Sequence, residues 1–293
     1  MTANRNRWLV GTVLTLALAA FLSISLLPLL GGNGTRRGGE PTEANPTATD
    51  PASVQAELEA QARGYELVLE REPDNQTALQ GLVDARIQLN DIDGVLGPLE
   101  RLVELNPDVP DYAVLLAQTK QQLGDLEGAA QTYRQVLDQQ PGNMNALQGL
   151  TVLLVQQNRP QAAIGLLQDT LKTAEQVQAE GATAGIDTVS VKLLLAQVHV
   201  EANSPGQAIA LYDETIATAP EDFRPVLAKA LVLQEQGEAD TAQALFAQAT
   251  ALAPAQFKDQ IELMSTQNQA APTTGSESVD PLEPAPATEG SAD

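Results

Sequence analysis

The chain has 293 residues, with 38 acidic and 16 basic side chains, one histidine and no cysteine. The resulting net charge of -22 argues against nucleic-acid binding, because contacts to phosphates need a basic surface. The lack of cysteine excludes disulfides, cysteine-ligated zinc, iron–sulfur clusters and a thiol nucleophile. Apolar residues make up 43% of the chain and aromatic residues only 3%; the apolar share is mainly Ala and Leu, which favours helices.

The N-terminal region carries a candidate membrane anchor. Residues 1–7 are short and basic, and residues 8–30 (WLVGTVLTLALAAFLSISLLPLL) contain no charged side chain. A helix of this length spans roughly 34 Å, enough to cross a hydrocarbon core of ~30 Å. The run is longer than the apolar region of a typical signal peptide, and no small-x-small cleavage site follows it. We therefore expect an uncleaved transmembrane helix, with a cleaved signal peptide as the alternative.

Charges beside the anchor give its expected orientation. Arg5, Arg7 and the terminal amine precede it, whereas Arg36 and Arg37 follow it. This small excess predicts a single-pass membrane protein with a cytoplasmic N-terminus and the remaining chain on the periplasmic or lumenal side.

Two segments have the composition of unfolded chain. Residues 31–52 are rich in Gly, Pro and Thr, which predicts a flexible linker. Residues 267–293 are rich in Pro and carry five acidic residues and no basic one, which predicts a disordered acidic tail.

The middle of the chain is repetitive. Prolines 73, 107, 141, 220 and 254 are separated by 34, 34, 79 and 34 residues, and 79 equals two periods plus 11 residues. A fixed period of this length indicates stacked helical repeats. The predicted full units are 76–109, 110–143, 144–177, 189–222 and 223–256, with an insertion at 178–188.

The units share a residue pattern. Small residues prevail at the eighth and twentieth positions, a large residue stands at the twenty-fourth, and proline follows; LGDLEGAAQTYRQVLDQQPGN at 123–143 shows the pattern most completely. It resembles that of the tetratricopeptide repeat (TPR) family. The resemblance covers roughly residues 53–266 and implies an all-α solenoid of helical hairpins, wound as a right-handed superhelix, behind the N-terminal transmembrane helix.

Some positions depart from the family pattern. The tryptophan expected at the fourth position is absent from every unit, and Glu175 replaces the proline of the third unit. We therefore expect the second helix of that unit to continue towards Glu180. Residues 53–72, with Ser53 as N-cap, and residues 257–266 are predicted to form capping helices at the two ends of the array.

The sequence contains no recognisable catalytic constellation. It has no phosphate loop, no dinucleotide-binding glycine motif and no nucleophile elbow. His199 falls at a repeat position that usually packs inward, and Asp91, Asp93 and Gly94 fall in an interhelical turn without the spacing of a calcium loop. We therefore expect no enzymatic activity, no cofactor and no metal site.

The resemblance implies a binding site for a protein or peptide. Ligands of the family usually occupy the groove lined by the first helix of each unit, at positions two, five, nine, twelve and thirteen. The chain lacks the Lys/Asn/Arg clamp with which some members capture the acidic C-termini of heat-shock chaperones. A groove of amides and aliphatic residues suits an apolar or amphipathic helix, or an extended peptide held through amide hydrogen bonds. The residues placed there are Gln80, Asp84, Val114, Gln118, Gln121, Asn145, Gln148, Val152, Val155, Leu193, Gln197, Val200, Leu227, Leu231 and Gln234.

These features predict a membrane-tethered scaffold for protein–protein interaction. Its similarity to anchored bacterial and cyanobacterial TPR proteins implies a role in assembly, secretion or quality control of an envelope or membrane complex. Its expected contacts are a protein or peptide partner and the bilayer around residues 8–30, and no nucleic acid. The alternative is a structural adaptor subunit that uses its convex face or its anchor.

Overall fold

The computed structural model describes residues 51–181 and 185–266. The basic N-terminus, the anchor at 8–30, nearly all of the linker, the acidic tail and residues 182–184 of the insertion lie outside these ranges. Within them the chain forms twelve α-helices and no strand, and no helix there is both long and apolar enough to cross a membrane. The helices are α2 (Pro51–Leu69), α3 (Gln76–Gln88), α4 (Ile92–Leu105), α5 (Pro110–Gln122), α6 (Leu126–Gln139), α7 (Met144–Gln156), α8 (Pro160–Ala179), α9 (Thr188–Glu201), α10 (Pro205–Thr218), α11 (Phe223–Glu235), α12 (Ala239–Leu252) and α13 (Ala255–Thr266).

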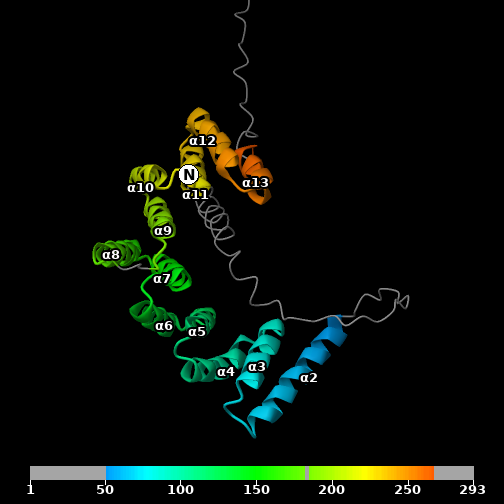
Figure 1. Ribbon diagram of the computed structural model, residues 1–293. Helices are drawn as coiled ribbons and strands as arrows, with labels where there is room; N and C mark the ends of the chain where they lie inside the picture. Colours follow the sequence, from blue (N-terminus) through cyan, green and yellow to red (C-terminus); the bar gives the residue numbers. More distant parts are fainter. Residues whose placement is uncertain (1–50, 182–184, 267–293) are drawn as a thin grey trace, which may run out of the picture.

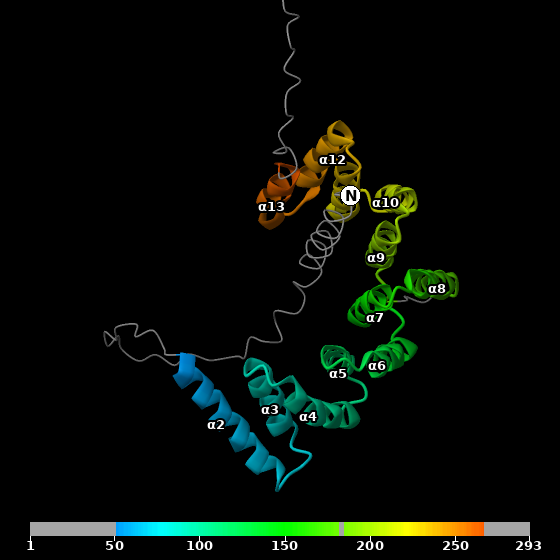
Figure 2. The same cartoon turned by 180° about the vertical axis from the view of Figure 1, so that it is seen from behind.

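The helices pair into hairpins that stack into an open arc (Figure 1). The pairs are α3–α4, α5–α6, α7–α8, α9–α10 and α11–α12, and consecutive pairs follow the 34-residue spacing apart from the insertion. Figures 1 and 2 show the first helix of each pair on the inner side of the arc and the second on the outer side. The expectation of an all-α helical solenoid is therefore confirmed.

Turn chemistry explains why each hairpin closes where it does. The second residue after the first helix has positive φ in every pair, with 57° at Asn90, 84° at Gly124, 59° at Asn158 and Asn203, and 86° at Gly237. Glycine and asparagine adopt this conformation at the lowest cost. The chain thus reverses at the same point in each repeat and starts the second helix two residues later.

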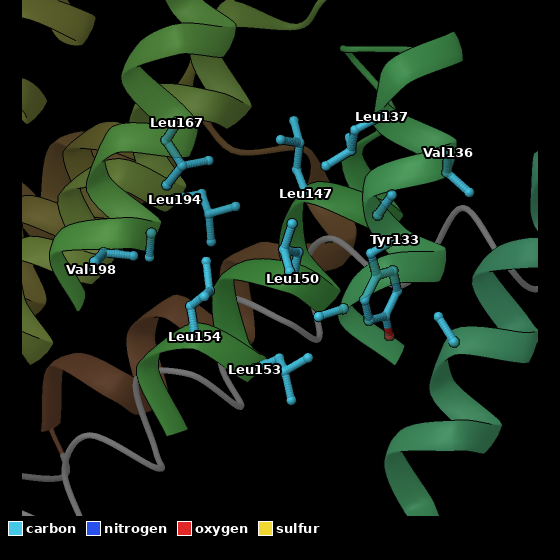
Figure 3. Packing of buried hydrophobic residues seen from close by; sticks show 14 of the residues in the cluster. Tyr133, Val136, Leu137, Leu147, Leu150, Leu153, Leu154, Leu167, Leu194 and Val198 are labelled. Atoms are coloured by element: carbon cyan, nitrogen blue, oxygen red, sulfur yellow. The ribbon is translucent and has the colours of Figure 1, made fainter. Parts of the chain in front are cut away.

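Buried side chains join neighbouring hairpins into a continuous core. The small residues at the twentieth position, such as Ala129, Ala163 and Ala208, are fully buried and allow the two helices of a pair to approach closely. The largest central cluster extends from α5 to α9, and Figure 3 shows its leucines and Tyr133 interleaved between successive helices. Each hairpin therefore shares its core with its neighbours.

The two ends of the array differ from the sequence expectation by a few residues. The first helix, α2, begins at Pro51, so the prediction that Ser53 is its N-cap is wrong, and Ala52 belongs to this helix. Proline is tolerated in the first helical turn because its missing N–H would have had no partner there. At the other end α13 begins at Ala255, close to the expected residue 257.

The third hairpin has the long second helix that the missing proline predicts. Helix α8 has 20 residues, whereas α4, α6, α10 and α12 each have 14. It ends at Ala179, and Gly181 follows with a φ of 77°. Past the gap, Ile186 packs so closely on Gly142 that a Cβ there would lie 2.8 Å from its Cγ1. The insertion thus packs on the end of the second unit, just before α7.

Candidate functional site

The candidate site is the inner surface of the arc, which we call the concave face. It is formed by α3, α5, α7, α9 and α11, the first helices of the five pairs (Figure 2). Residues four apart on a helix lie on the same side. The ninth and thirteenth positions of a unit therefore face the same way, and on the five helices they form two parallel rows.

Most of the residues predicted for this face are accessible to solvent. The exposed or half-buried ones include all the predicted amides, and Val152 keeps 37% of its surface exposed. Amide and aliphatic side chains are thus mixed along the face. The accessible residues are Gln80, Asp84, Gln118, Gln121, Asn145, Gln148, Val152, Val155, Gln197, Val200, Leu231 and Gln234.

Three of the predicted residues are instead part of the core. Val114, Leu193 and Leu227 are only 5%, 4% and 4% exposed and belong to the buried clusters between hairpins. All three occupy the fifth position, where Gln80 and Gln148 remain partly or fully accessible. An apolar side chain at this position turns into the seam between successive helices, because burial there removes it from water. These three offer a ligand almost no surface.

The thirteenth position supplies five further exposed residues that the sequence argument left out. Each lies four residues after a ninth-position residue and therefore on the same side of its helix. Helical periodicity alone would have found them. They are Gln88, Gln122, Gln156, Glu201 and Glu235.

Amide hydrogen bonds connect neighbouring helices along the face. The Nε2 of Gln121 on α5 donates to Oε1 of Gln156 on α7 over 3.3 Å, and that of Gln80 on α3 donates to the hydroxyl of Tyr112 on α5. At the far end, Gln234 donates to the backbone carbonyl of Ser265 over 3.4 Å. An amide has two donor hydrogens and a carbonyl acceptor, so each keeps capacity for a ligand.

Basic side chains on these helices are directed away from the concave face. Lys120, Lys192 and Lys229 are 21%, 19% and 19% exposed, and each pairs with a carboxylate on an outer helix. The two arginines are also engaged: Arg86 pairs with residues of α2 and the α3–α4 turn, and Arg224 pairs with Asp222 over 2.6 Å. Helix α7 has no basic residue.

Acidic side chains on the same helices lack basic partners in the described part of the chain. These are Asp84, Asp111, Glu201 and Glu235, none of which forms an ion pair there. Desolvation raises the pKa of both Asp84 and Glu201, although a hydrogen bond from Gln197 partly opposes the shift at Glu201. The concave face therefore carries uncompensated negative charge.

The two patterns that could have suggested catalysis or metal binding have structural roles. His199 is 8% exposed, and desolvation lowers its pKa, as expected for a packing residue. Asp91 is the N-cap of α4, and its side chain accepts a hydrogen bond from the Gly94 N–H over 3.1 Å. The turn interpretation is thus confirmed for Asp91, whereas Asp93 and Gly94 lie in the first turn of α4. Nowhere in residues 51–181 and 185–266 do three metal-ligating side chains gather in a possible metal site.

Several solved structures are similar to this chain in their fold. A TPR protein of Thermus thermophilus, TTC0263, is 20% identical, with 66% of this chain and 98% of that one covered and a TM-score of 0.45. Yeast Tom70 is 13% identical, with 71% of this chain and 42% of Tom70 covered and a TM-score of 0.50. MamA is 18% identical, with 63% of this chain and 94% of MamA covered and a TM-score of 0.42. At these identities the likeness concerns the fold alone. No curated protein matches the chain.

Comparison with protein families gives one consistent description. Two family models described as tetratricopeptide repeat match the chain, one at residues 121–184 and the other at residues 81–144 and 193–257. The matches together span more than half of the 293 residues and include parts of all five helix pairs. The chain therefore belongs to the tetratricopeptide repeat family.

Proposed function

We propose that this protein is a membrane-tethered scaffold that binds a segment of a partner protein on its concave face. The TPR fold itself suggests a scaffold for protein–protein interaction. The proposed role is to assist assembly, secretion or quality control of an envelope or membrane complex. No catalytic step is part of this proposal.

One observation carries the choice of the concave face. Solvent-accessible amides occur on at least four successive inner helices: Gln80 and Gln118 are exposed, and Gln148 and Gln197 are half-buried. Amide side chains can donate to and accept from the backbone of an extended peptide, and accessible Val152 and Leu231 lie in the same ninth-position row. A long polar row with apolar contacts suits a peptide better than a compact small molecule, which needs an enclosed pocket.

Membrane tethering rests on the sequence of residues 8–30, which is apolar and uncharged over 23 residues. The charges beside it favour a solenoid on the periplasmic or lumenal side. In that arrangement the concave face would be presented to proteins that cross or assemble at the same membrane.

Site-specific photocrosslinking tests the proposal. A benzoylphenylalanine residue replaces Gln118 on α5 in one variant and Gln135 on α6 in the other; both glutamines are exposed and belong to the same hairpin. In membranes from the native host, we expect a discrete crosslinked partner from position 118 and none from 135. Crosslinks from position 135 alone would favour the adaptor function, with contacts on the convex face.

A further inference from the structure

We propose that the concave face selects an extended, cationic segment of its partner protein. This inference rests on the proposed function, because it specifies the chemistry of the segment bound at the same face. It is carried by the charge distribution on the inner helices, where every lysine and arginine is paired, whereas Arg134 on α6 and Lys172 on α8 are exposed and form no ion pair in the described part of the chain.

The inner helices present acids without available bases. Asp84 on α3, Asp111 on α5, Glu201 on α9 and Glu235 on α11 are exposed and form no ion pair in the described part of the chain. Because they belong to four of the five inner helices, they form an extended distribution along the face. A partner with spaced positive charges could therefore meet several of them at once.

The bases on these helices are already neutralised at the back of the face. The Nζ of Lys192 lies 2.7 Å from a carboxylate oxygen of Glu214, and that of Lys120 lies 3.5 Å from Glu100. The partner carboxylates belong to outer helices and are more exposed than the lysines. An incoming acidic segment would meet repulsion from the face and find no free cation to offset it.

Local environment adds to the preference for a cation. Desolvation raises the pKa of Asp84 and Glu201, which means that their charged forms lack full compensation from water or protein. A positive group placed beside them supplies that compensation. The neighbouring amides, such as Gln197 beside Glu201, can at the same time bond to the backbone of an extended chain.

The test uses the full chain in detergent micelles and a set of labelled Gly/Ser peptides of equal length. The peptides carry Lys, Gln or Glu at the same positions, and binding is measured by fluorescence anisotropy. We expect the Lys peptide to bind most tightly and the Glu peptide not to bind. Raising the NaCl concentration from about 50 to about 300 mM should weaken the Lys complex, because salt screens exposed charges.

A matched pair of variants separates the concave face from the overall negative charge. The inner variant is Asp84→Asn/Glu201→Gln/Glu235→Gln. The outer variant makes the same change in net charge at exposed positions on α6 and α8: Asp169→Asn/Glu127→Gln/Glu175→Gln. We expect the inner variant to bind the Lys peptide about tenfold more weakly and the outer variant to change less than about twofold. Unchanged helicity by circular dichroism establishes that both variants are folded.

Three results would overturn the proposal. The first is equal binding of all the peptides, and the second is an equal loss of affinity in the inner and outer variants. The third is a severalfold gain of affinity for the Lys peptide in the Arg36→Gln/Arg37→Gln variant. Such a gain would mean that Arg36 and Arg37 of the same chain compete for the concave face, so that its ligand is the chain's own basic pair and not a partner. Each of these can occur while crosslinking at Gln118 still succeeds, so the charge preference and the binding face can fail independently.

Discussion

The ring of Tyr133 on α6 occupies the space that a side chain at Gly149 on α7 would need. A Cβ at Gly149 would overlap ring carbons and lie 2.6 Å from the tyrosine hydroxyl oxygen. Tyr65 on α2 and Gly81 on α3 have the same relationship two junctions earlier in the array. The two residues occupy the twenty-fourth position of one unit and the sixth of the next, so the pairing holds consecutive hairpins together.

Other junctions fill the same space differently. Leucine at the twenty-fourth position is followed by leucine at the next sixth position, as in the pair Leu167 and Leu194 (Figure 3). The space between consecutive hairpins can therefore be filled in two ways: by a tyrosine ring opposite a glycine, or by two leucine side chains opposite each other.

This complementarity predicts strong coupling between the two positions. We expect Gly149→Leu alone to lower the free energy of unfolding by about 1–3 kcal/mol through overpacking, and Tyr133→Leu alone to lower it by leaving a cavity. The double variant should recover much of both losses, with a coupling above about 1 kcal/mol in denaturant titrations. Gly165→Ala is the control, because its Cβ would meet nothing within 4 Å; additive losses in the double variant would refute the pairing.

Burial of the same tyrosine predicts a dependence of stability on alkaline pH. Desolvation raises the pKa of Tyr133 to about 12, above the value of about 10 for a tyrosine in an unfolded chain. The folded state thus favours the neutral phenol, and this contribution is complete below pH ~10 and is lost as the pH rises towards ~12. In denaturant titrations across this range, the Tyr133→Phe variant should lose less stability than the wild type. Parallel curves would contradict the assigned burial.

Close helix approach at Ala129 gives a third prediction. This residue is 0% exposed, at the point where the two helices of its hairpin meet. Ala129→Leu should cost about 1–3 kcal/mol of unfolding free energy, felt mainly by the adjoining hairpins because the array is nearly one-dimensional. Ala247→Leu, at an exposed position of α12, should change stability by less than about 0.5 kcal/mol. If the two substitutions changed the amide hydrogen exchange of their hairpins equally, Ala129 would not be at a close contact between helices.

The proposed anchor can be tested on the natural membrane. Because residues 8–30 are long, apolar and uncharged, the protein should remain in the pellet after an alkaline carbonate wash and keep its full-length mass. A released protein whose sequence starts near residue 31 would show instead that the segment is a cleaved signal peptide.

The sequence predicts the hairpins well because their determinants are local. Asparagine or glycine at each turn and a fixed proline spacing specify where helices start and stop without knowledge of the partner surfaces. Ser53 as N-cap predicts a later start for α2 than Pro51, because that prediction leaves out proline, which is acceptable in the first turn of a helix.

Features that depend on contacts between repeats were harder to predict. Periodicity places Val114 and Gln148 at the same position, but only the packing of successive helices shows that the valine is buried and the glutamine is accessible. The engagement of Lys192 by Glu214 on the next helix likewise needs the three-dimensional arrangement. The charge of the concave face therefore could not be derived from composition alone.

A steric block of the concave face tests the central claim most directly. The inner variant, Gln118→Trp/Gln156→Trp, places two large side chains on α5 and α7, and the control, Gln135→Trp/Gln168→Trp, places them on α6 and α8; all four glutamines are exposed. The measurement is the amount of co-purifying protein per bait from detergent-solubilised membranes, by quantitative mass spectrometry. We expect the inner variant to lose its main partner and the outer variant to keep it at the wild-type level. Full retention by the inner variant, with loss from the outer one, would contradict binding at the concave face.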